Sequence, residues 1–162
     1  MRRRRTRQVR VQKKLLIDTN ILLLYIVGSL DLDRIARHKR TDKFSVEDYF
    51  LLEELLRRFG GIVVTPNILT EVSNLLGSTD EATGERLLAL LGTLVPVFEE
   101  RYVPSVQAIE VAEFSRLGLA DASVLSSAEK EVAVLTDDLH LYLSLQRRGV
   151  EAINFNHLRE TS

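Results

Sequence analysis

Short apolar runs alternate with stretches of helical periodicity along this chain. The runs at 15–17, 62–64 and 132–135 are continuously apolar, and each is followed by a segment with apolar residues at helical spacing or with helix-favouring composition. Strands that are apolar on both faces belong in a parallel sheet that helices cover on each side. The pattern therefore predicts a single α/β domain.

Local sequence marks where several of the helices begin and end. Ser45 and Asp48 have the spacing of a capping box, and the glycines at 60 and 61 end the helix that follows. Thr65 and Pro66 are typical of the N-cap and first position of a helix, which we expect to end near Gly77. The remaining predicted elements are helices over 85–94, 104–117, 121–130 and 137–148 and short strands over 95–98 and 150–153.

Composition is that of a globular protein with a substantial core. The chain has 162 residues, of which 45% are hydrophobic and 28% charged. The absence of cysteine excludes a disulfide scaffold, a thiolate metal site and a cysteine nucleophile. The most apolar stretch, 15–27, is interrupted by Asp18 and Asn20 and is too short to span a bilayer, so we expect a cytoplasmic protein without membrane contact.

Charge is distributed unevenly. Residues 1–14 hold eight of the 22 basic residues and no acidic residue, so the rest of the chain has a formal charge of −9. This asymmetry divides the chain into a basic arm over 1–13, which we expect to be disordered, and one domain over 14–162. The arm is either a solvated terminus or a segment that contacts phosphates.

Carboxylates follow the predicted strands. Asp18 comes directly after the first strand, Glu71 lies on the helix after the second, Asp121 follows Gly118, and Asp137 and Asp138 follow the run at 132–135. Ligands of open parallel sheets bind beyond the carboxyl ends of the strands. Carboxylates gathered there repel one another unless a cation lies between them, and an all-oxygen donor set favours Mg²⁺ or Mn²⁺. Such a site suits phosphoryl chemistry.

Each acid also has a structural interpretation. Asp121 and Asp137 occupy positions typical of N-caps or first-turn acids, and Glu71 alone resembles a surface glutamate. Asp18 is harder to explain in this way because it interrupts a buried apolar run. The acids occur together at four strand exits, which capping alone does not explain. We do not expect the three histidines to bind the metal.

These residues resemble the PIN-domain nuclease family over nearly the whole chain. The matching elements, in order, are Ile17-Asp18-Thr19-Asn20, Thr65-Pro66 followed by Glu71, Leu119-Ala120-Asp121-Ala122, and Leu135-Thr136-Asp137-Asp138. The resemblance implies a three-layer α/β/α sandwich with a mainly parallel sheet. It also implies an endonuclease that requires Mg²⁺ or Mn²⁺ and cleaves single-stranded RNA.

The resemblance also assigns roles to individual residues. It implies that Asp18, Glu71, Asp121 and Asp138 form the catalytic, metal-binding quartet. It implies that Asn20 and Thr136 support these carboxylates by hydrogen bonds, and that Asp137 shares or replaces the role of Asp138.

Two features differ from the small toxin members of the family. The stretch from Asp18 to Glu71 is long because residues 29–44 add a charged loop, and the basic arm precedes the domain. A toxin with a protein antitoxin and an RNA-processing or decay nuclease both fit, and the apolar helical surface is compatible with a homodimer.

Two other function classes share parts of this pattern. One is an inactive PIN-like module that binds RNA or protein. The other is a phosphatase of the haloacid-dehalogenase type, which needs an aspartate two residues after the nucleophilic aspartate and a lysine near the late-strand acid. This chain has Asn20 at the first position, and we expect no lysine near Asp137.

Overall fold

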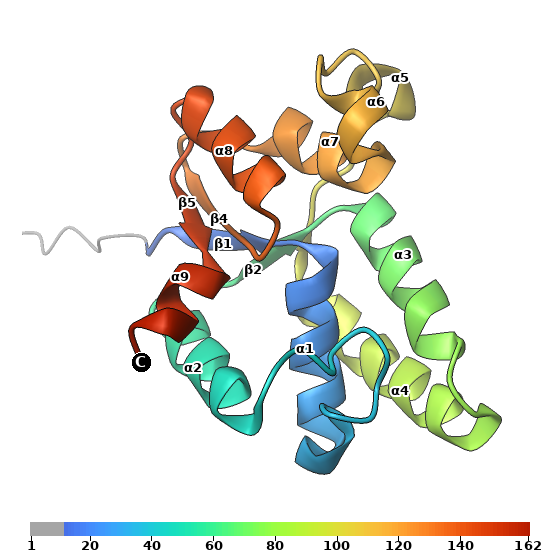
Figure 1. Cartoon of the computed structure of the whole chain (residues 1–162). Helices are drawn as coiled ribbons and strands as arrows, with labels where there is room; N and C mark the ends of the chain where they lie inside the picture. The colour runs from blue at the N-terminus through green and yellow to red at the C-terminus, as the bar shows by residue number, and fades with distance from the viewer. Residues whose placement is uncertain (1–11) are drawn as a thin grey trace, which may run out of the picture.

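The computed structural model describes residues 12–162, which form a five-stranded sheet covered by helices on both faces (Figure 1). The strand order is β3-β2-β1-β4-β5, and every neighbouring pair is parallel. The predicted α/β class and sandwich architecture are therefore confirmed. The strands are β1 Lys14–Ile17, β2 Ile62–Val64, β3 Glu99–Glu100, β4 Val132–Thr136 and β5 Ala152–Asn154.

The helices divide between the two faces according to the direction in which the chain crosses the sheet. Helices α1 to α4 pack against one another below the sheet as drawn in Figure 1, and α5 to α8 lie above it. This arrangement is the one expected for right-handed crossovers, because the chain leaves β1 toward β2 and later returns past β1 to β4. The helices are α1 Thr19–Leu30, α2 Val46–Leu56, α3 Pro66–Gly77, α4 Glu81–Leu94, α5 Ser105–Ala108, α6 Phe114–Leu117, α7 Leu119–Ser127, α8 Leu139–Arg147 and α9 Phe155–Glu160.

The core explains the most apolar stretch of the chain. Strand β4 is buried along its whole length, and β1 is buried from Leu15 to Ile17. Helix α1 lies between the sheet and helices α2, α3 and α4, so that most of its residues are buried and it has no polar face. The stretch at 15–27 is therefore a buried strand followed by a buried helix. No helix within residues 12–162 is long and apolar enough to cross a membrane.

Most predicted boundaries agree with the structure. Ser45 and Asp48 form the capping box of α2, and Thr65 caps α3 with Pro66 in its first turn. Helix α4 begins at Glu81, four residues earlier than expected, because Asp80 caps it. Helix α9 was not predicted.

Three expectations about the second half of the chain were wrong. The predicted strand over 95–98 is a 3-10 turn, and the pairing strand is Glu99–Glu100 just after it. In place of the single helix expected over 104–117, the chain forms two short helices, α5 and α6. The helix expected from Asp137 begins at Leu139, with Asp138 as its N-cap.

The end of the charged loop is anchored by helix α9. Residues 31–44 form a 3-10 turn at Leu32–Arg34 followed by further turns. Arg159 of α9 pairs with Asp48, donates to the Lys43 carbonyl over 2.8 Å, and lies over the Phe44 ring. The end of this loop is thereby placed beside β4.

The predicted arm over 1–13 lies almost entirely outside the described residues. Its last residue, Lys13, joins the domain, since its carbonyl accepts from Gly60 and its ammonium group pairs with Glu151. Lys14 pairs with Glu99.

Candidate active site

The site lies where the chain changes direction across the sheet. Strands β1 and β4 are neighbours, but the chain leaves them toward opposite edges. In open α/β sheets such a switch point opens a crevice at the carboxyl ends of the strands. Asp18 and Asp138 stand at these two strand exits and cap the next helices, accepting from Ile21 and Leu141 over 3.0 and 2.9 Å.

Hydrogen bonds fix the orientation of the Asp18 carboxylate. One oxygen accepts from the backbone of Ile21, and the other accepts from the hydroxyl of Thr136 and from the backbone of Asp137 over 3.3 Å. The Thr136 oxygen in turn accepts from the backbone of Asp138 over 3.0 Å. Thr136 therefore connects the two strand-exit acids, and its side chain is fully buried.

Helices α3 and α7 bring the two other acids to the same place. Their N-terminal turns are joined by a hydrogen bond of 2.8 Å between the hydroxyls of Thr65 and Ser123. Glu71 lies on the second turn of α3 and accepts from Thr19 over 3.1 Å. Asp121 lies in the first turn of α7, which begins at a left-handed Gly118 with φ of 84°.

These acids line one cavity of about 290 Å³. Its wall is mostly polar and also includes Arg40 from the charged loop. The four carboxylates in the wall are those of Asp18, Glu71, Asp121 and Asp138.

Their surroundings disfavour the charged forms of two of these carboxylates. Burial raises the pKa of Asp18 from 3.8 to about 7, and the nearby Asp137 carboxylate contributes in the same direction. Burial also raises the pKa of Asp121 to about 7, with further contributions from Asp138 and Glu71. In the absence of a cation, the site therefore favours protonation of these two side chains near neutral pH.

Asp137 is held apart from this cavity. Its carboxylate pairs with Lys43 and accepts from Asn20 over 3.1 Å, and its carbonyl accepts from Asn156 over 2.9 Å. The expectation that no lysine lies near Asp137 was wrong, because Lys43 reaches it from a segment 94 residues earlier in the chain. Asp138, and not Asp137, lines the cavity.

The donor set fits Mg²⁺ or Mn²⁺. All four acidic side chains in the cavity wall offer oxygen, which these hard cations prefer. Within residues 12–162, no three acidic or histidine side chains stand close enough to form a ready-made cluster of metal ligands. This spacing is compatible with Mg²⁺, which usually keeps several waters and takes one or two carboxylates together with substrate phosphates.

Comparison with known proteins relates this architecture to solved structures. No protein-family model and no curated protein matches the chain by sequence. The structure is similar to that of VapBC2 from Rickettsia felis bound to a DNA fragment from their promoter, with a TM-score of 0.53 and 14% identity over 87% of this chain and 98% of the other. It is also similar to PAE2754 from Pyrobaculum aerophilum, with a TM-score of 0.51 and 19% identity over 90% of this chain and 92% of the other. The chain has the PIN fold.

Within this PIN fold, three polar residues near the acids were not predicted from the sequence. Thr19 donates to Glu71, Lys43 pairs with Asp137, and Arg40 lines the cavity. Thr19 follows Asp18 directly and could have been suspected from that position. Lys43 and Arg40 lie in a loop of mixed charge, where nothing distinguishes them from their neighbours.

Proposed function

We propose that this protein is a metal-dependent endoribonuclease that cleaves single-stranded RNA. The observation that carries the proposal is the cavity at the switch point, where Asp18, Glu71, Asp121 and Asp138 converge from four separate elements. Burial and mutual repulsion raise the pKa values of Asp18 and Asp121, so a bound cation would relieve a strain that helix capping does not explain.

The reaction we propose is hydrolysis of a phosphodiester bond. A water oxygen forms a bond to phosphorus in line with the leaving oxygen, and the bond from phosphorus to the 3′ oxygen breaks. The products are a 5′-phosphate and a 3′-hydroxyl, which takes up a proton. When bound, Mg²⁺ or Mn²⁺ would polarise the phosphate and lower the pKa of a water molecule.

The side chains of this chain divide the remaining tasks. One or two of the four carboxylates would bind the cation directly and the others through its bound waters, and Thr136 keeps the Asp18 carboxylate in one orientation. Thr19 does the same for Glu71. Lys43 and Asn20 hold Asp137 as a supporting group that keeps the strand exit rigid, so we assign Asp138 to the metal and Asp137 to the scaffold.

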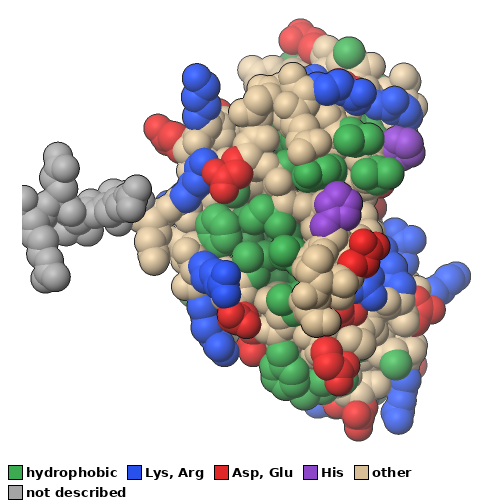
Figure 2. Space-filling view, turned by 60° about the vertical axis from the view of Figure 1, so that its left-hand side comes forward, with side chains coloured by type: hydrophobic (Ala, Val, Ile, Leu, Met, Phe, Trp, Pro, Cys, Tyr) green, Lys and Arg blue, Asp and Glu red, His purple; other side chains and the backbone are tan. Residues whose placement is uncertain are grey.

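A partner protein also belongs to this proposal. One structural neighbour is a VapBC assembly, and we infer that this chain acts either with an antitoxin or as an RNA-processing nuclease. Figure 2 shows hydrophobic side chains gathered on one face between charged ones. Large hydrophobic side chains are also exposed on single helices, Phe50 on α2 and Leu139 and Leu143 on α8, and such side chains would favour contact with an antitoxin or a second copy.

Metal binding and cleavage can be tested on the purified full chain. We expect millimolar Mn²⁺ or Mg²⁺ to raise the melting temperature by mass action, and cleavage of an unstructured RNA to stop in EDTA and return with Mn²⁺. The control is Asp121→Asn, which should lose both effects. Cleavage that survives full chelation would overturn the metal mechanism. If the metal neither stabilises the protein nor supports cleavage, the result would indicate the inactive binding module.

A further inference from the structure

A second cavity lies beside the acidic one and has the opposite charge. It occupies about 530 Å³ between residues 34–40 of the charged loop and the facing ends of α3 and α4. Arg40 lines both cavities, so the two sites adjoin. The basic residues around it are Arg34, Arg37, Lys39 and Arg40, and the acidic residue is Asp80.

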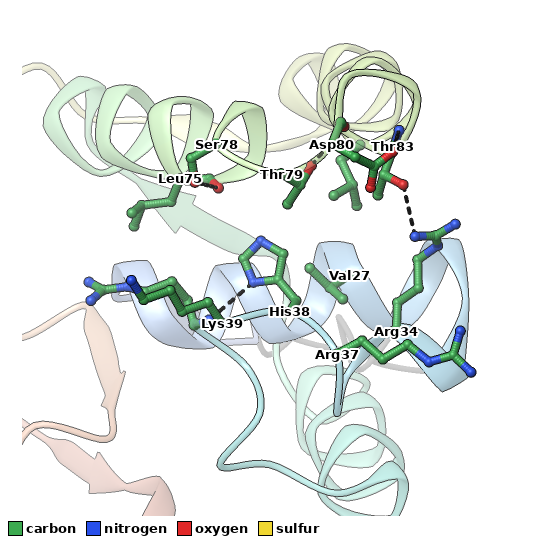
Figure 3. A pocket seen from close by; sticks show the side chains of 12 residues that line it. Val27, Arg34, Arg37, His38, Lys39, Leu75, Ser78, Thr79, Asp80 and Thr83 are labelled. Atoms are coloured by element: carbon green, nitrogen blue, oxygen red, sulfur yellow. Dashed lines mark hydrogen bonds between the residues drawn. The ribbon is translucent and has the colours of Figure 1, made fainter.

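The charges stand at the two ends of this cavity. Figure 3 shows His38 in the middle, with Arg34 and Arg37 toward one end and Lys39 toward the other. Arg34 is engaged by Thr83, to which it donates over 2.9 Å. Within residues 12–162, Arg37, Lys39 and Arg40 form no ion pair and are exposed. Three exposed cations are therefore available to phosphates at this cavity.

The middle of the cavity combines an apolar wall with a buried donor. Val27, Leu75 and Leu87 supply the wall. The Nδ1 atom of His38 accepts from the backbone of Arg40 over 3.2 Å, so in the neutral ring the proton is on Nε2. His38 is buried, and its Nε2 faces the backbone carbonyl of Leu75 without the geometry of a normal hydrogen bond, so a base that enters the cavity would compete with that carbonyl for the Nε2 proton.

We propose that this cavity binds a nucleotide of the RNA strand next to the cleaved bond. The base would lie on the apolar wall near the His38 donor, and the flanking phosphates would contact Arg37 and Lys39. Arg40 would contact the phosphate that leads to the carboxylate cavity. The proposal rests on the proposed function, since it assigns part of the substrate of that same site.

The size and charge of the cavity support this occupant. Pockets for small ligands commonly measure about 300–1,000 Å³, so one nucleotide fits the volume. The body of the protein is acidic overall and repels RNA at long range, whereas this loop places exposed cations beside the acidic site. A strand that crosses this cavity would be guided past the four carboxylates.

The test compares two double variants of equal net charge in an Asp18→Asn background of the full chain. Arg37→Ala with Lys39→Ala removes two cations of the cavity. Arg147→Ala with Lys130→Ala removes two exposed cations that lie elsewhere and form no ion pair within residues 12–162, and it is the matched control. The probe is a fluorescent single-stranded 12-nucleotide RNA, and Kd is measured over a salt series.

We expect the cavity variant to bind roughly tenfold more weakly than the control, and its slope of log K against log salt to fall by about 1.4, as for two lost phosphate contacts. A 4-thiouridine probe should crosslink to the peptides that contain His38 or Leu87 in the background protein. Equal Kd and slope in both variants, with the background protein still binding RNA, would overturn the nucleotide site alone. Failure of the background protein to bind RNA, with no cleavage by the unmodified chain, would overturn the proposed function itself.

Discussion

Asp137 and Asp138 are neighbours in the chain, but their side chains have different surroundings. Asp138 caps α8 and faces the carboxylate cavity. The Asp137 side chain is only 3% exposed and is neutralised by Lys43. The difference in orientation allows a role in metal binding to be separated from a role in stability by single substitutions.

Substitution of Asp138 should therefore lower mainly the activity, whereas substitution of Asp137 should lower mainly the stability. Asp138→Asn should lower cleavage by more than about 100-fold, since even loss of a ligand's outer partner costs about 10–100-fold. Its stability should hardly change, because asparagine caps helices as well as aspartate does. Asp137→Asn should lower the free energy of unfolding by about 1–3 kcal/mol through the lost pairing with Lys43, and cleavage should fall less.

Cleavage rates and urea unfolding of the two variants provide the measurement. A larger loss of activity in Asp137→Asn than in Asp138→Asn would show that the assignment within this pair is wrong.

The raised pKa values of Asp18 and Asp121 predict how stability depends on pH. Both carboxyls titrate near pH 3.8 when unfolded and near pH 7 when folded, so the folded state binds more protons between these values. The metal-free protein should therefore lose stability as the pH rises from about 4 to about 7 and change little from these groups above that. Each pKa unit corresponds to about 1.4 kcal/mol.

The melting temperature in EDTA, measured from pH 5 to pH 8, tests this dependence. Asp121→Asn should flatten the fall and be more stable than the parent at pH 8. The comparison with the parent also cancels the contribution of His38, since both proteins contain it. Its lowered pKa makes stability rise with pH, opposite to the effect of the two carboxyls. An equally steep fall in Asp121→Asn would contradict the assignment.

At the scale of elements, the site depends on how closely the helices pack. Helix α1 carries Asp18 and Thr19 at its start and packs against α2 through Gly28. A Cβ atom at Gly28 would lie 2.2 Å from Cδ2 of the Tyr49 ring, which is too close for any side chain to be accepted unchanged. The absence of a side chain at Gly28 therefore sets the distance between these two helices.

Gly28→Ala should force the Tyr49 ring to move and should destabilise the protein by about 1–3 kcal/mol. The hydrogen bond of Tyr49 to Ser29 should be weakened at the same time. Urea unfolding measures the loss, and Gly28→Ala combined with Tyr49→Leu should recover part of it. If Gly28→Ala alone leaves the free energy of unfolding unchanged, α1 and α2 can move apart without cost and the expectation is wrong.

Sequence patterns placed the elements well wherever the information was local. Apolar runs identified β1, β2 and β4, and caps such as Ser45 and Thr65 identified helix starts. Strand β3 has only two residues, both glutamates, and nothing in such a segment distinguishes a strand from a loop. The break between α5 and α6 depends on tertiary packing, which outweighs local helix preference.

The same limit applies to the site. The sequence was sufficient to predict that four acids share one site, because the carboxyl ends of parallel strands lie at one edge of the sheet. These acids are Asp18, Glu71, Asp121 and Asp138. The pairing of Lys43 with Asp137 and the burial of His38 could not be predicted, because both depend on how a loop of irregular turns folds back on the domain.

At the scale of the whole molecule, the distribution of charge governs how RNA approaches. The domain after residue 14 carries a formal charge of −9, and six arginines lie within residues 2–10. Since each phosphate contact with a single strand adds about 0.7 to the salt dependence of log K, the arm and the cavity contribute separately measurable amounts.

Deleting residues 2–10 should weaken RNA binding at low salt and flatten the slope of log K against log salt by up to about 4, if all six arginines contact phosphate. Binding titrations over a salt series in the Asp18→Asn background measure this change. A variant with the six arginines replaced by glutamine keeps the length of the arm and should behave like the deletion. Superimposable slopes for parent and deletion would mean that the arm is only a solvated terminus.

The position of β1 in the middle of the sheet determines when the site can exist during synthesis. Residues 14–100 contain β1, β2 and β3, which can pair with one another as soon as they emerge from the ribosome. The partner on the other side of β1 is β4, and the hydroxyl that orients Asp18 lies 118 residues later, at Thr136. Pairing across so long a separation comes late in folding because of its entropic cost. A nascent chain that ends before residue 132 therefore has neither the last acid nor the strand that closes the crevice, so no site can be assembled until the ribosome has passed Asp138.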